Sequence, residues 1–265
     1  MTAPSLGPLL SVRGLRKVFA DDVVAVDNLT FDLSQGESLA IVGESGSGKT
    51  TTARIIAGLD SATAGDVLLD GRPMAGTGRR RRRDVQMVFQ DPFGSLDPRQ
   101  KVGAAIAELL AVHFRLSKAE RRSRVAGLLD EVGLDERHAS EYPRNLSGGQ
   151  RQRVAIARAL ALEPRLLILD EAVAALDVSV QAQVLNLLID LRDRRDISYL
   201  FVSHDLAVVR QISDRCLVMC AGALVEQGET RDVLDNPRES YTRQLLDAVP
   251  RPGWIPRRRQ AGTPS

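Results

Sequence analysis

Cysteine is scarce in this sequence, with only Cys216 and Cys220 among 265 residues. Two cysteines exclude the disulfide framework of a small secreted protein. If the segment between them is extended, it spans roughly 13 Å, which is too far for a disulfide. We therefore expect a protein of a reducing compartment.

An excess of one charge is also missing. Lys and Arg total 36 against 34 Asp and Glu, which leaves a net charge of +2 and no global footprint of a nucleic-acid-binding protein. Two local basic runs remain, the five arginines at 79–83 and the three at 257–259. We interpret the first as a solvated connecting helix before a strand and the second as part of a loose tail, rather than as nucleic-acid or lipid sites.

No apolar run is long enough to cross a bilayer, because residues 206–226 are interrupted by Arg210, Asp214 and Arg215. The first ten residues lack the basic region and the apolar stretch of a secretory signal. The sequence therefore predicts a cytoplasmic protein that does not span a membrane, although it can still dock onto a membrane partner.

Hydrophobic residues (43%) and charged residues (26%) are present in ordinary globular proportions, so the chain can bury a core. Alternating apolar residues at 10–12 and 29–33 predict half-buried antiparallel strands. Continuous apolar runs at 39–42, 166–169 and 199–202 predict buried parallel strands, and helical spacing follows the first of them at 49–57. Parallel strands that alternate with helices indicate an α/β fold.

The remaining segments complete the predicted organisation. Residues from about 101 to 162 have helical periodicity, residues 217–225 predict a hairpin around Ala221 and Gly222, and 241–248 predict a last helix. We expect one domain over 1–250, with a helical subdomain at about 91–162, and a flexible Pro- and Arg-rich tail at 251–265.

A glycine-rich segment between the strand at 39–42 and the following helix fits the phosphate-binding loop pattern. The segment is Gly43, Glu44, Ser45, Gly46, Ser47, Gly48, Lys49 and Thr50. Glycines let the backbone N–H groups approach the phosphates of a nucleotide, Lys49 should reach the β- and γ-phosphates, and Thr50 should bind Mg²⁺. The alternative, a plain glycine-rich turn, does not explain why a strand precedes the segment and a helix follows it.

Two carboxylates, Asp170 and Glu171, end the apolar strand at 166–169. An Asp in this place is typical of the Mg²⁺ side of a nucleotidase, and an adjacent carboxylate can orient or deprotonate the attacking water. Alone, the pair could be an acidic strand end; beside a phosphate-binding loop in the same sheet, the catalytic interpretation is favoured.

The segment 146–150, Leu-Ser-Gly-Gly-Gln, opens a helix with apolar residues at helical spacing. A Ser cap with free N–H groups is a second candidate anion site, although the same pattern could be only a helix cap.

Taken together, these segments resemble the ATP-binding cassette of ABC transporters. They occur in the order of that family over nearly the whole chain: the loop at 43–50, Gln90 in VFQDP, LSGGQ at 146–150, RLLILDE at 165–171, Leu176-Asp177, and His204 in VSHD. The resemblance implies a P-loop NTPase with a RecA-like mixed sheet, an antiparallel N-terminal β subdomain and a helical insert. It also implies ATP and Mg²⁺ as cofactors.

The resemblance assigns roles to individual residues. Glu171 would act on water, His204 would contact the γ-phosphate, and Thr50, Gln90 and Asp170 would hold Mg²⁺. Gln90 also counts among the catalytic candidates, and Thr51 extends the loop. Phe19, 24 residues before Gly43, lies where the family places an aromatic that stacks on adenine; its alternative is a core Phe on an edge strand. In the family, Ser147, Gly148, Gly149 and Gln150 complete the ATP site of a second cassette.

The resemblance also implies partners. With a single set of motifs, the chain would dimerise with itself or with a related ATPase. It would sit on two permease subunits at the cytoplasmic face of the cell membrane, contact them through residues near 90–99, and serve an extracytoplasmic solute-binding protein indirectly. Neither His113 nor His138 has a functional context in the sequence.

The sequence departs from the family after Glu171, where Ala172-Val173-Ala174-Ala175 replaces the usual Pro-Thr-Ser-Ala. Ala174 lacks a hydroxyl that could lie at the dimer interface, which bears on communication between sites rather than on nucleotide binding. Because Glu171 and His204 are retained, we expect a competent ATPase.

Three stretches, at 85–103, 176–188 and 241–250, are similar to the second ATPase subunit of bacterial oligopeptide and dipeptide importers. That subfamily also includes importers of nickel and other small solutes, so the cargo stays open between these classes. Glu239-Ser240 stands where a His-Pro is common, and no cysteine cluster follows the cassette, so we expect no iron–sulfur centre. Other ABC proteins differ in their organisation: soluble ATPases of ribosomes or DNA tend to carry paired cassettes or a coiled coil, and exporters should lack the 241–250 segment. A guanine-nucleotide switch would carry Asn-Lys-x-Asp, and an inactive nucleotide binder would lack Glu171 or His204.

Overall fold

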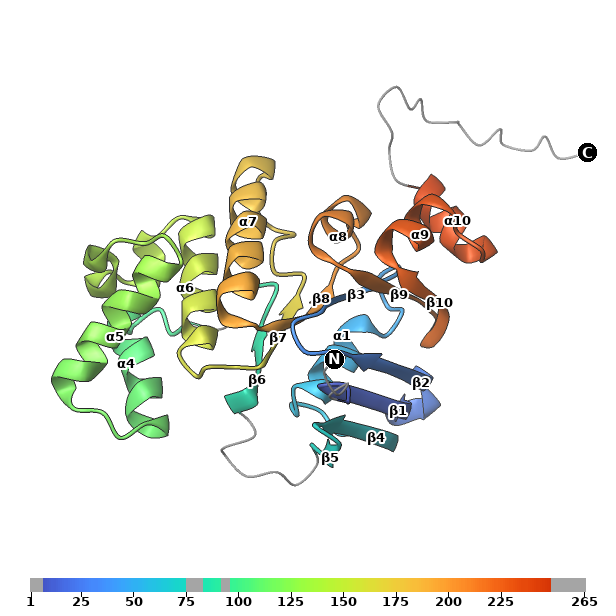
Figure 1. Ribbon diagram of the computed structural model, residues 1–265, viewed down its shortest axis with the longest axis horizontal. Coiled ribbons are helices and arrows are strands. Elements are labelled where there is room, and N and C mark those ends of the chain that lie inside the picture. Colours follow the sequence, from blue (N-terminus) through green and yellow to red (C-terminus); the bar gives the residue numbers. More distant parts are fainter. Residues whose placement is uncertain (1–6, 75–82, 92–95, 249–265) are drawn as a thin grey trace, which may run out of the picture.

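A six-stranded mixed sheet forms the centre of the protein (Figure 1). The computed structural model describes residues 7–74, 83–91 and 96–248. In spatial order the strands are β10 (Ala223–Glu229), β9 (Arg215–Cys220), β3 (Ser38–Val42), β8 (Ser198–Val202), β7 (Leu166–Asp170) and β6 (Val85–Val88). All neighbours are parallel except β10, which forms an antiparallel hairpin with β9. The predicted α/β fold is confirmed.

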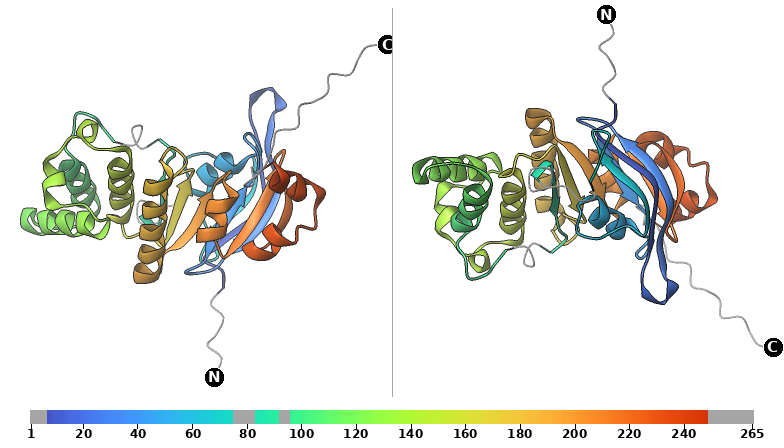
Figure 2. Two further views of the ribbon diagram at one scale, coloured as in Figure 1. Left: turned by 90° about the horizontal axis from the view of Figure 1, so that it is seen from above. Right: turned by 90° about the horizontal axis from the view of Figure 1, so that it is seen from below.

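A second, four-stranded antiparallel sheet lies beside the first (Figure 2). Its order is β2 (Val24–Leu33), β1 (Leu10–Val18), β4 (Ala64–Leu69) and β5 (Arg72–Pro73). In β1 and β2 the apolar residues Leu10, Val12, Leu29 and Leu33 are fully buried, as their alternation predicts. A short 3₁₀ helix, η1 (Ala20–Asp22), precedes β2.

The central parallel strands β3, β7 and β8 are mostly apolar and fully buried, because both faces of the sheet are covered there. Leu200 and Val202 of β8 point into a core shared with the antiparallel sheet and α1 (Lys49–Ile56). Tyr199 and Phe201 point into the opposite core, which contains residues of α6 (Gly148–Leu160) and α7 (Val178–Arg195). The predicted strands at 39–42, 166–169 and 199–202 are therefore confirmed as buried strands.

The helices of the middle segment gather at one end of the molecule, beyond α7 (Figures 1 and 2). They are α4 (Val102–His113), α5 (Lys118–Glu131) and α6, with the short helices η2 (Glu136–Ser140) and η3 (Pro143–Asn145). Ile106, Leu110 and Leu129 are fully buried between them. Ser117 begins α5 with a capping box to Glu120, which satisfies backbone N–H groups at its first turn. No helix among the described residues is long and apolar enough to cross a bilayer.

The C-terminal segment packs on the other end of the sheet. It consists of α8 (Leu206–Ile212), the β9–β10 hairpin, α9 (Thr230–Asp235) and α10 (Ser240–Asp247). The predicted hairpin around Ala221 and Gly222 and the predicted last helix are both present; the tail 251–265 lies outside the described residues.

Of the arginine run at 79–83, only Arg83 is described. Its guanidinium stacks on the Phe114 ring at 4.0 Å and lies 3.7 Å from a Glu163 carboxylate oxygen. Its side chain is 23% exposed. The ring and the carboxylate thus partly shield this residue from water, and the other four arginines of the predicted solvated helix lie outside the described residues.

The alternation of core faces along β8 gives a stability prediction. Leu200 is fully buried, whereas Leu59, after α1, is 51% exposed. We expect Leu200→Ala to lower the free energy of unfolding by about 2–5 kcal/mol, because it leaves a cavity. Leu59→Ala should change it by less than about 0.5 kcal/mol. Urea denaturation of the two variants measures the difference, and equal losses would contradict the assignment of Leu200 to the core.

Candidate functional site

The loop at residues 43–50 joins β3 to α1, and two of its glycines are required by their surroundings. Gly43 has φ +149° and Gly48 has φ +98°, conformations that side chains rarely adopt. A Cβ on Gly43 would lie 2.2 Å from the Met219 carbonyl oxygen, and one on Gly48 would lie 2.3 Å from the Ala25 carbonyl oxygen. The loop is thus pressed against β9 and β2. On its other side, a Cβ on Gly46 would meet nothing within 4 Å, so the loop faces open space there.

Lys49 is buried in this loop. Its ammonium donates to the Gly43 carbonyl at 2.9 Å and to the Glu44 carbonyl at 2.7 Å. Burial lowers the pKa of Lys49, and the charges of Glu171 and Asp170 oppose that shift. The Ser47 hydroxyl is buried and has no hydrogen-bond partner. A buried cation, an unpartnered hydroxyl and a glycine backbone at a helix N-terminus fit an anionic phosphate chain. Glu44, Ser45 and Thr51 complete the loop at or near the surface.

Asp170 and Thr50 form a pair of oxygen ligands next to the loop. Asp170 is the last residue of β7 and is 6% exposed. The Thr50 hydroxyl donates to its carboxylate at 3.0 Å. Burial raises the pKa of Asp170, and the hydrogen bond from Thr50 opposes this. Mg²⁺ is usually held by one or two such oxygens together with substrate phosphates, so the pair fits that ion.

Gln90 lies at the same edge of the sheet. It is the second residue after β6, which pairs with β7 in parallel register, Val88 opposite Leu169. The carboxyl ends of the two strands therefore meet at one edge. The Gln90 side chain is exposed there.

Glu171 and His204 contact each other at this edge. His204 Nδ1 lies 3.2 Å from Glu171 Oε1. Glu171 has φ +48°, and its backbone N–H donates to the Val202 carbonyl of β8. The turn brings its carboxylate, 20% exposed, against the imidazole, 58% exposed. A partly exposed carboxylate can accept a proton from a water molecule, and the imidazole beside it can hold that carboxylate in position.

Phe19 is 46% exposed, and the Lys17 ammonium lies 4.9 Å from the centre of its ring. The alternative of a core Phe on an edge strand is therefore wrong. An exposed aromatic face is free to stack on a planar ring.

The segment 146–150 starts α6 with a capping box. The Ser147 hydroxyl accepts from Gln150 N at 3.3 Å, and Gln150 Oε1 accepts from Ser147 N at 2.9 Å. A Cβ on Gly149 would lie 2.4 Å from Val180 Cγ1 of α7, so a side chain at this position would need Val180 to move. Within residues 7–74, 83–91 and 96–248, no hydrogen bond joins this segment to the loop at 43–50.

His138 is a neighbour of the segment that the sequence did not single out. Because Gln150 Oε1 accepts from Ser147, the amide NH₂ of Gln150 faces His138 Nε2, at 3.3 Å. Nε2 must then accept, which places the ring proton on Nδ1, 3.0 Å from the Asp135 carbonyl oxygen. His138 is 8% exposed, and in this tautomer its Nε2 holds the amide of the Gln150 side chain. Its contact partner lies twelve residues away on another element, so no local pattern marks it.

The four residues after Glu171 divide between the core and the surface. Ala172 and Val173 are buried, and Val173 packs in the core below α7. Ala174 and Ala175 are exposed. Packing thus accommodates the replacements at 172 and 173. Of the exposed pair only Ala174 differs from the usual segment, so it alone changes the surface of the site.

A search of family models matches residues 26–174 to the family described as ABC transporter. Among curated proteins, the chain is 49% identical over 257 residues to the glutathione import ATP-binding protein GsiA of Salmonella typhimurium, covering 92% of this chain and 41% of that protein. It is 50% identical over 241 residues to GsiA of Escherichia coli K12, covering 89% and 39%. The chain thus spans about two fifths of the length of these curated relatives.

Solved structures agree with the family match. CbiO1 from Clostridium perfringens, part of the ABC transporter complex CbiONQ, has a TM-score of 0.78 and 30% identity, covering 86% of this chain and 91% of that one. The dimeric structure of the bacterial ABC transporter cassette MJ0796 has a TM-score of 0.75 and 31% identity, covering 84% and 99%. A structure of the same cassette bound to ADP and Pi scores 0.74. The chain belongs to the ABC transporter family and carries its ATP-binding domain.

Proposed function

We propose that the chain is an ATP-hydrolysing subunit of an ABC importer, in which ATP binding and hydrolysis drive the uptake of a small peptide. One observation carries the proposal: Lys49, the Thr50–Asp170 pair and the Glu171–His204 pair gather at one edge of the parallel sheet. Phosphoryl transfer depends mainly on positioning and charge neutralisation, and these groups supply both.

The loop residues hold the phosphates. Lys49 donates to phosphate oxygens, and the backbone N–H groups of 43–51 surround them. Thr50, Gln90 and Asp170 hold Mg²⁺, which neutralises charge on the phosphates when bound. Phe19 stacks on the adenine ring from its exposed position near η1.

Glu171 acts as the general base. Its carboxylate orients a water molecule and accepts its proton as the water oxygen bonds to the γ-phosphorus. The bond between that phosphorus and the β-phosphate oxygen breaks, and ADP leaves. His204, in contact with Glu171 Oε1, fixes the carboxylate and contacts the γ-phosphate with its other ring nitrogen. Loss of the carboxylate would leave binding intact and remove the base.

The segment 146–150 serves the site of a second cassette. Its Ser cap and its glycine backbone form an anion site that the phosphate-binding loop of the same chain does not use. The dimeric structure of MJ0796 supports a pairing of two cassettes. The partner is a second copy of this chain or a related ATPase.

The cargo is assigned by relatives alone. The GsiA proteins are named for glutathione import, and glutathione is a tripeptide, which agrees with the similarity to oligopeptide and dipeptide importers. Nickel or another small solute is the alternative within the same machine, and a soluble ABC ATPase without transport is a more distant one.

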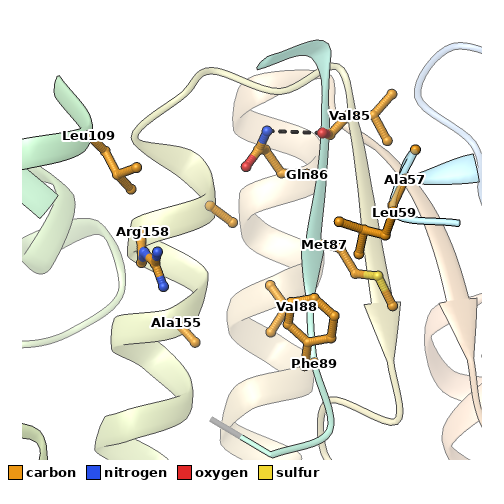
Figure 3. Close-up of a pocket in the computed structure, with 12 residues that line it drawn as sticks. Ala57, Leu59, Val85, Gln86, Met87, Val88, Phe89, Leu109, Ala155 and Arg158 are labelled. Atoms are coloured by element: carbon orange, nitrogen blue, oxygen red, sulfur yellow. Dashed lines mark hydrogen bonds between the residues drawn. The ribbon is translucent and has the colours of Figure 1, made fainter. Parts of the chain in front are cut away.

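A groove beside β6 is where we propose that the permease docks, which would hold the chain at the cytoplasmic face of the membrane. The first part, about 280 Å³, lies between β6, α6 and the turn after α1 (Figure 3). Leu109 and Arg158 continue it into a second part along α4. Leu59 and Val112 at its rim are 51% and 59% exposed. Of the residues expected to contact the permease, Phe93 lies outside the described residues and Leu96 is buried at 4% exposure, so Val112 is the better probe.

Two substitutions test the ATPase. Lys49→Ala should weaken ATP binding by roughly 10- to 100-fold, because a charge-assisted contact is lost. Glu171→Gln should retain ATP binding but lower turnover by about 100- to 10,000-fold. Calorimetric binding and phosphate release measure the two effects. Wild-type turnover in both variants would refute the assignment.

Asp170 predicts a pH dependence. Its pKa is raised by burial above the ordinary value of 3.8, so its charge lowers the stability of the nucleotide-free chain at neutral pH, and that effect disappears as the pH falls through the folded-state pKa. Asp170→Asn should therefore melt at a higher temperature than wild type at pH 7, and the difference should shrink toward pH 4.

Addition of Mg²⁺ and ATP should raise the melting temperature of the wild type, and Asp170→Asn should lose most of that rise. Asp66→Asn, at an exposed position of β4, is the matched control and should leave both measurements unchanged. A variant at Asp170 that keeps the full Mg²⁺-dependent shift would remove Asp170 from the metal site.

The permease groove is tested by co-purification. Tagged Glu171→Gln chain with ATP, recovered from gently solubilised membranes, should bring down two polytopic permeases, a sibling ATPase or a second copy, and a solute-binding protein whose ligand identifies the cargo. Adding Val112→Glu should reduce permease recovery by at least about tenfold, since it buries an unpaired charge. Adding Ala64→Glu, at an exposed position of β4, should not. Ribosomal or DNA-repair proteins without a membrane subunit would favour a soluble ATPase instead.

A further inference from the structure

The last helix of the described chain touches the phosphate-binding loop. The Glu44 backbone N–H donates to the Tyr241 hydroxyl of α10, with 3.4 Å between the two atoms. Tyr241 lies 197 residues away along the chain and outside the segment 26–174 that matches the family model. The contact is therefore not part of the motif that defines the loop.

The hydrogen bond from Glu44 N to Tyr241 fixes the N–H side of a peptide unit, and Lys49 fixes the carbonyl side of the same unit. The Glu44 N–H and the Gly43 carbonyl belong to the same peptide bond, and a trans peptide points them in opposite directions; no cis peptide is present among the described residues. The carbonyl accepts from Lys49 at 2.9 Å. The orientation of this unit, at the entrance of the loop, is thus fixed from both sides.

These contacts do not use every N–H donor of the Lys49 ammonium. A Lys side chain has three N–H donors, and Lys49 uses two of them on the Gly43 and Glu44 carbonyls. The third remains for a phosphate oxygen. The Tyr241 hydroxyl therefore supports the loop, whereas the Lys49 ammonium can donate both to the loop and to the nucleotide.

α10 is itself firmly attached, so Tyr241 can act as a support. Tyr241, Leu245 and Leu246 pack on a core cluster that includes Val42, the residue immediately before the loop, and Val218 of β9. Ahead of the helix, the Glu226 carboxylate accepts from Arg238 N at 2.8 Å and from Glu239 N at 3.2 Å. The ring of Tyr241 is therefore anchored on this core cluster, while its hydroxyl reaches the loop.

The phenol has the protonation state that this bond requires. Burial raises the pKa of Tyr241 above its ordinary value, so the group is neutral at physiological pH. The Cys220 side chain is a second hydrogen-bonding neighbour of the phenol. The phenol oxygen accepts from Glu44 N.

We propose that Tyr241 is a positioning residue of the nucleotide site, whose hydroxyl orients the Gly43–Glu44 peptide and so raises the affinity of the loop for nucleoside di- and triphosphates. The inference rests on the proposed function only in that the loop binds a nucleotide. It assigns to α10 a role inside the ATP site.

Tyr241→Phe removes the hydroxyl and keeps the ring that packs on the core cluster. We expect the Kd values for ATP and for ADP to rise together by roughly threefold to tenfold, the range for loss of one neutral hydrogen bond. Turnover at saturating ATP should change by less than about twofold, because Tyr241 does not touch the reacting groups. Tyr142→Phe, the same change in the helical part of the chain, is the control and should leave the Kd unchanged.

A second measurement does not depend on nucleotide. In the nucleotide-free protein, the Glu44 amide proton should exchange faster with solvent in Tyr241→Phe than in wild type, while amides of β8 keep their protection. Tyr241→Leu, which also removes the ring, tests whether packing alone matters. If Tyr241→Phe binds nucleotide like wild type and only Tyr241→Leu is impaired, the proposal is overturned. If the wild type itself does not bind ATP or ADP, the proposed function fails instead, and the amide exchange still decides whether the hydroxyl orients the loop.

Discussion

Parallel pairing of β3, β8, β7 and β6 is the constraint on which the site depends. Their register sets Ile41 and Asp170 opposite Val202, and Val88 opposite Leu169. The carboxyl ends of four strands therefore lie at one edge, and each strand delivers its polar residues there. The loop, Gln90, the Asp170–Glu171 pair and His204 come from distant parts of the sequence, yet strand pairing alone brings them together. A one-residue slip of any strand would exchange its two core faces and displace its contribution.

Charge at this edge is balanced within the protein before any nucleotide arrives. Lys49 is buried between two carboxylates, which oppose the effect of burial on its pKa, while burial raises the pKa of Asp170. A buried ammonium and a buried carboxylate each lose hydration, and each is compensated by fixed dipoles: two carbonyls for Lys49 and the Thr50 hydroxyl for Asp170. If the proposed site binds a phosphate chain, these groups would need little reorganisation on binding, because their hydrogen bonds already hold them in place.

The sequence predicted the central strands and the phosphate-binding loop because both depend on local patterns. Apolar runs that end in Gly43, Asp170 or His204 mark strand ends, and glycine spacing marks the loop. His138, Tyr241 and Arg83 were not predicted in their observed roles. His138 holds Gln150 across two elements, Tyr241 reaches the loop from 197 residues away, and Arg83 stacks on Phe114. Hydrogen bonds and ring contacts over such distances leave no periodicity, so only the folded chain reveals them.

The two glycine-rich segments differ in what surrounds them, and this difference supports the proposal that the second segment serves the site of another cassette. The loop at 43–50 is supported from behind by β2, β9 and α10, and charged groups face it from the same sheet. The segment at 146–150 is supported by α7 and His138, but the polar ligands of the first segment are absent from its hydrogen bonds within the described residues. A capping box and the His138 imidazole hold this segment rigidly, and its glycine backbone packs close on Val180. The segment is therefore preorganised to present N–H donors outward. The Arg151 guanidinium donates to the Leu146 carbonyl of this segment. N–H donors beside that cation suit an anion brought by another molecule, which is what the phosphates bound to a second cassette would provide.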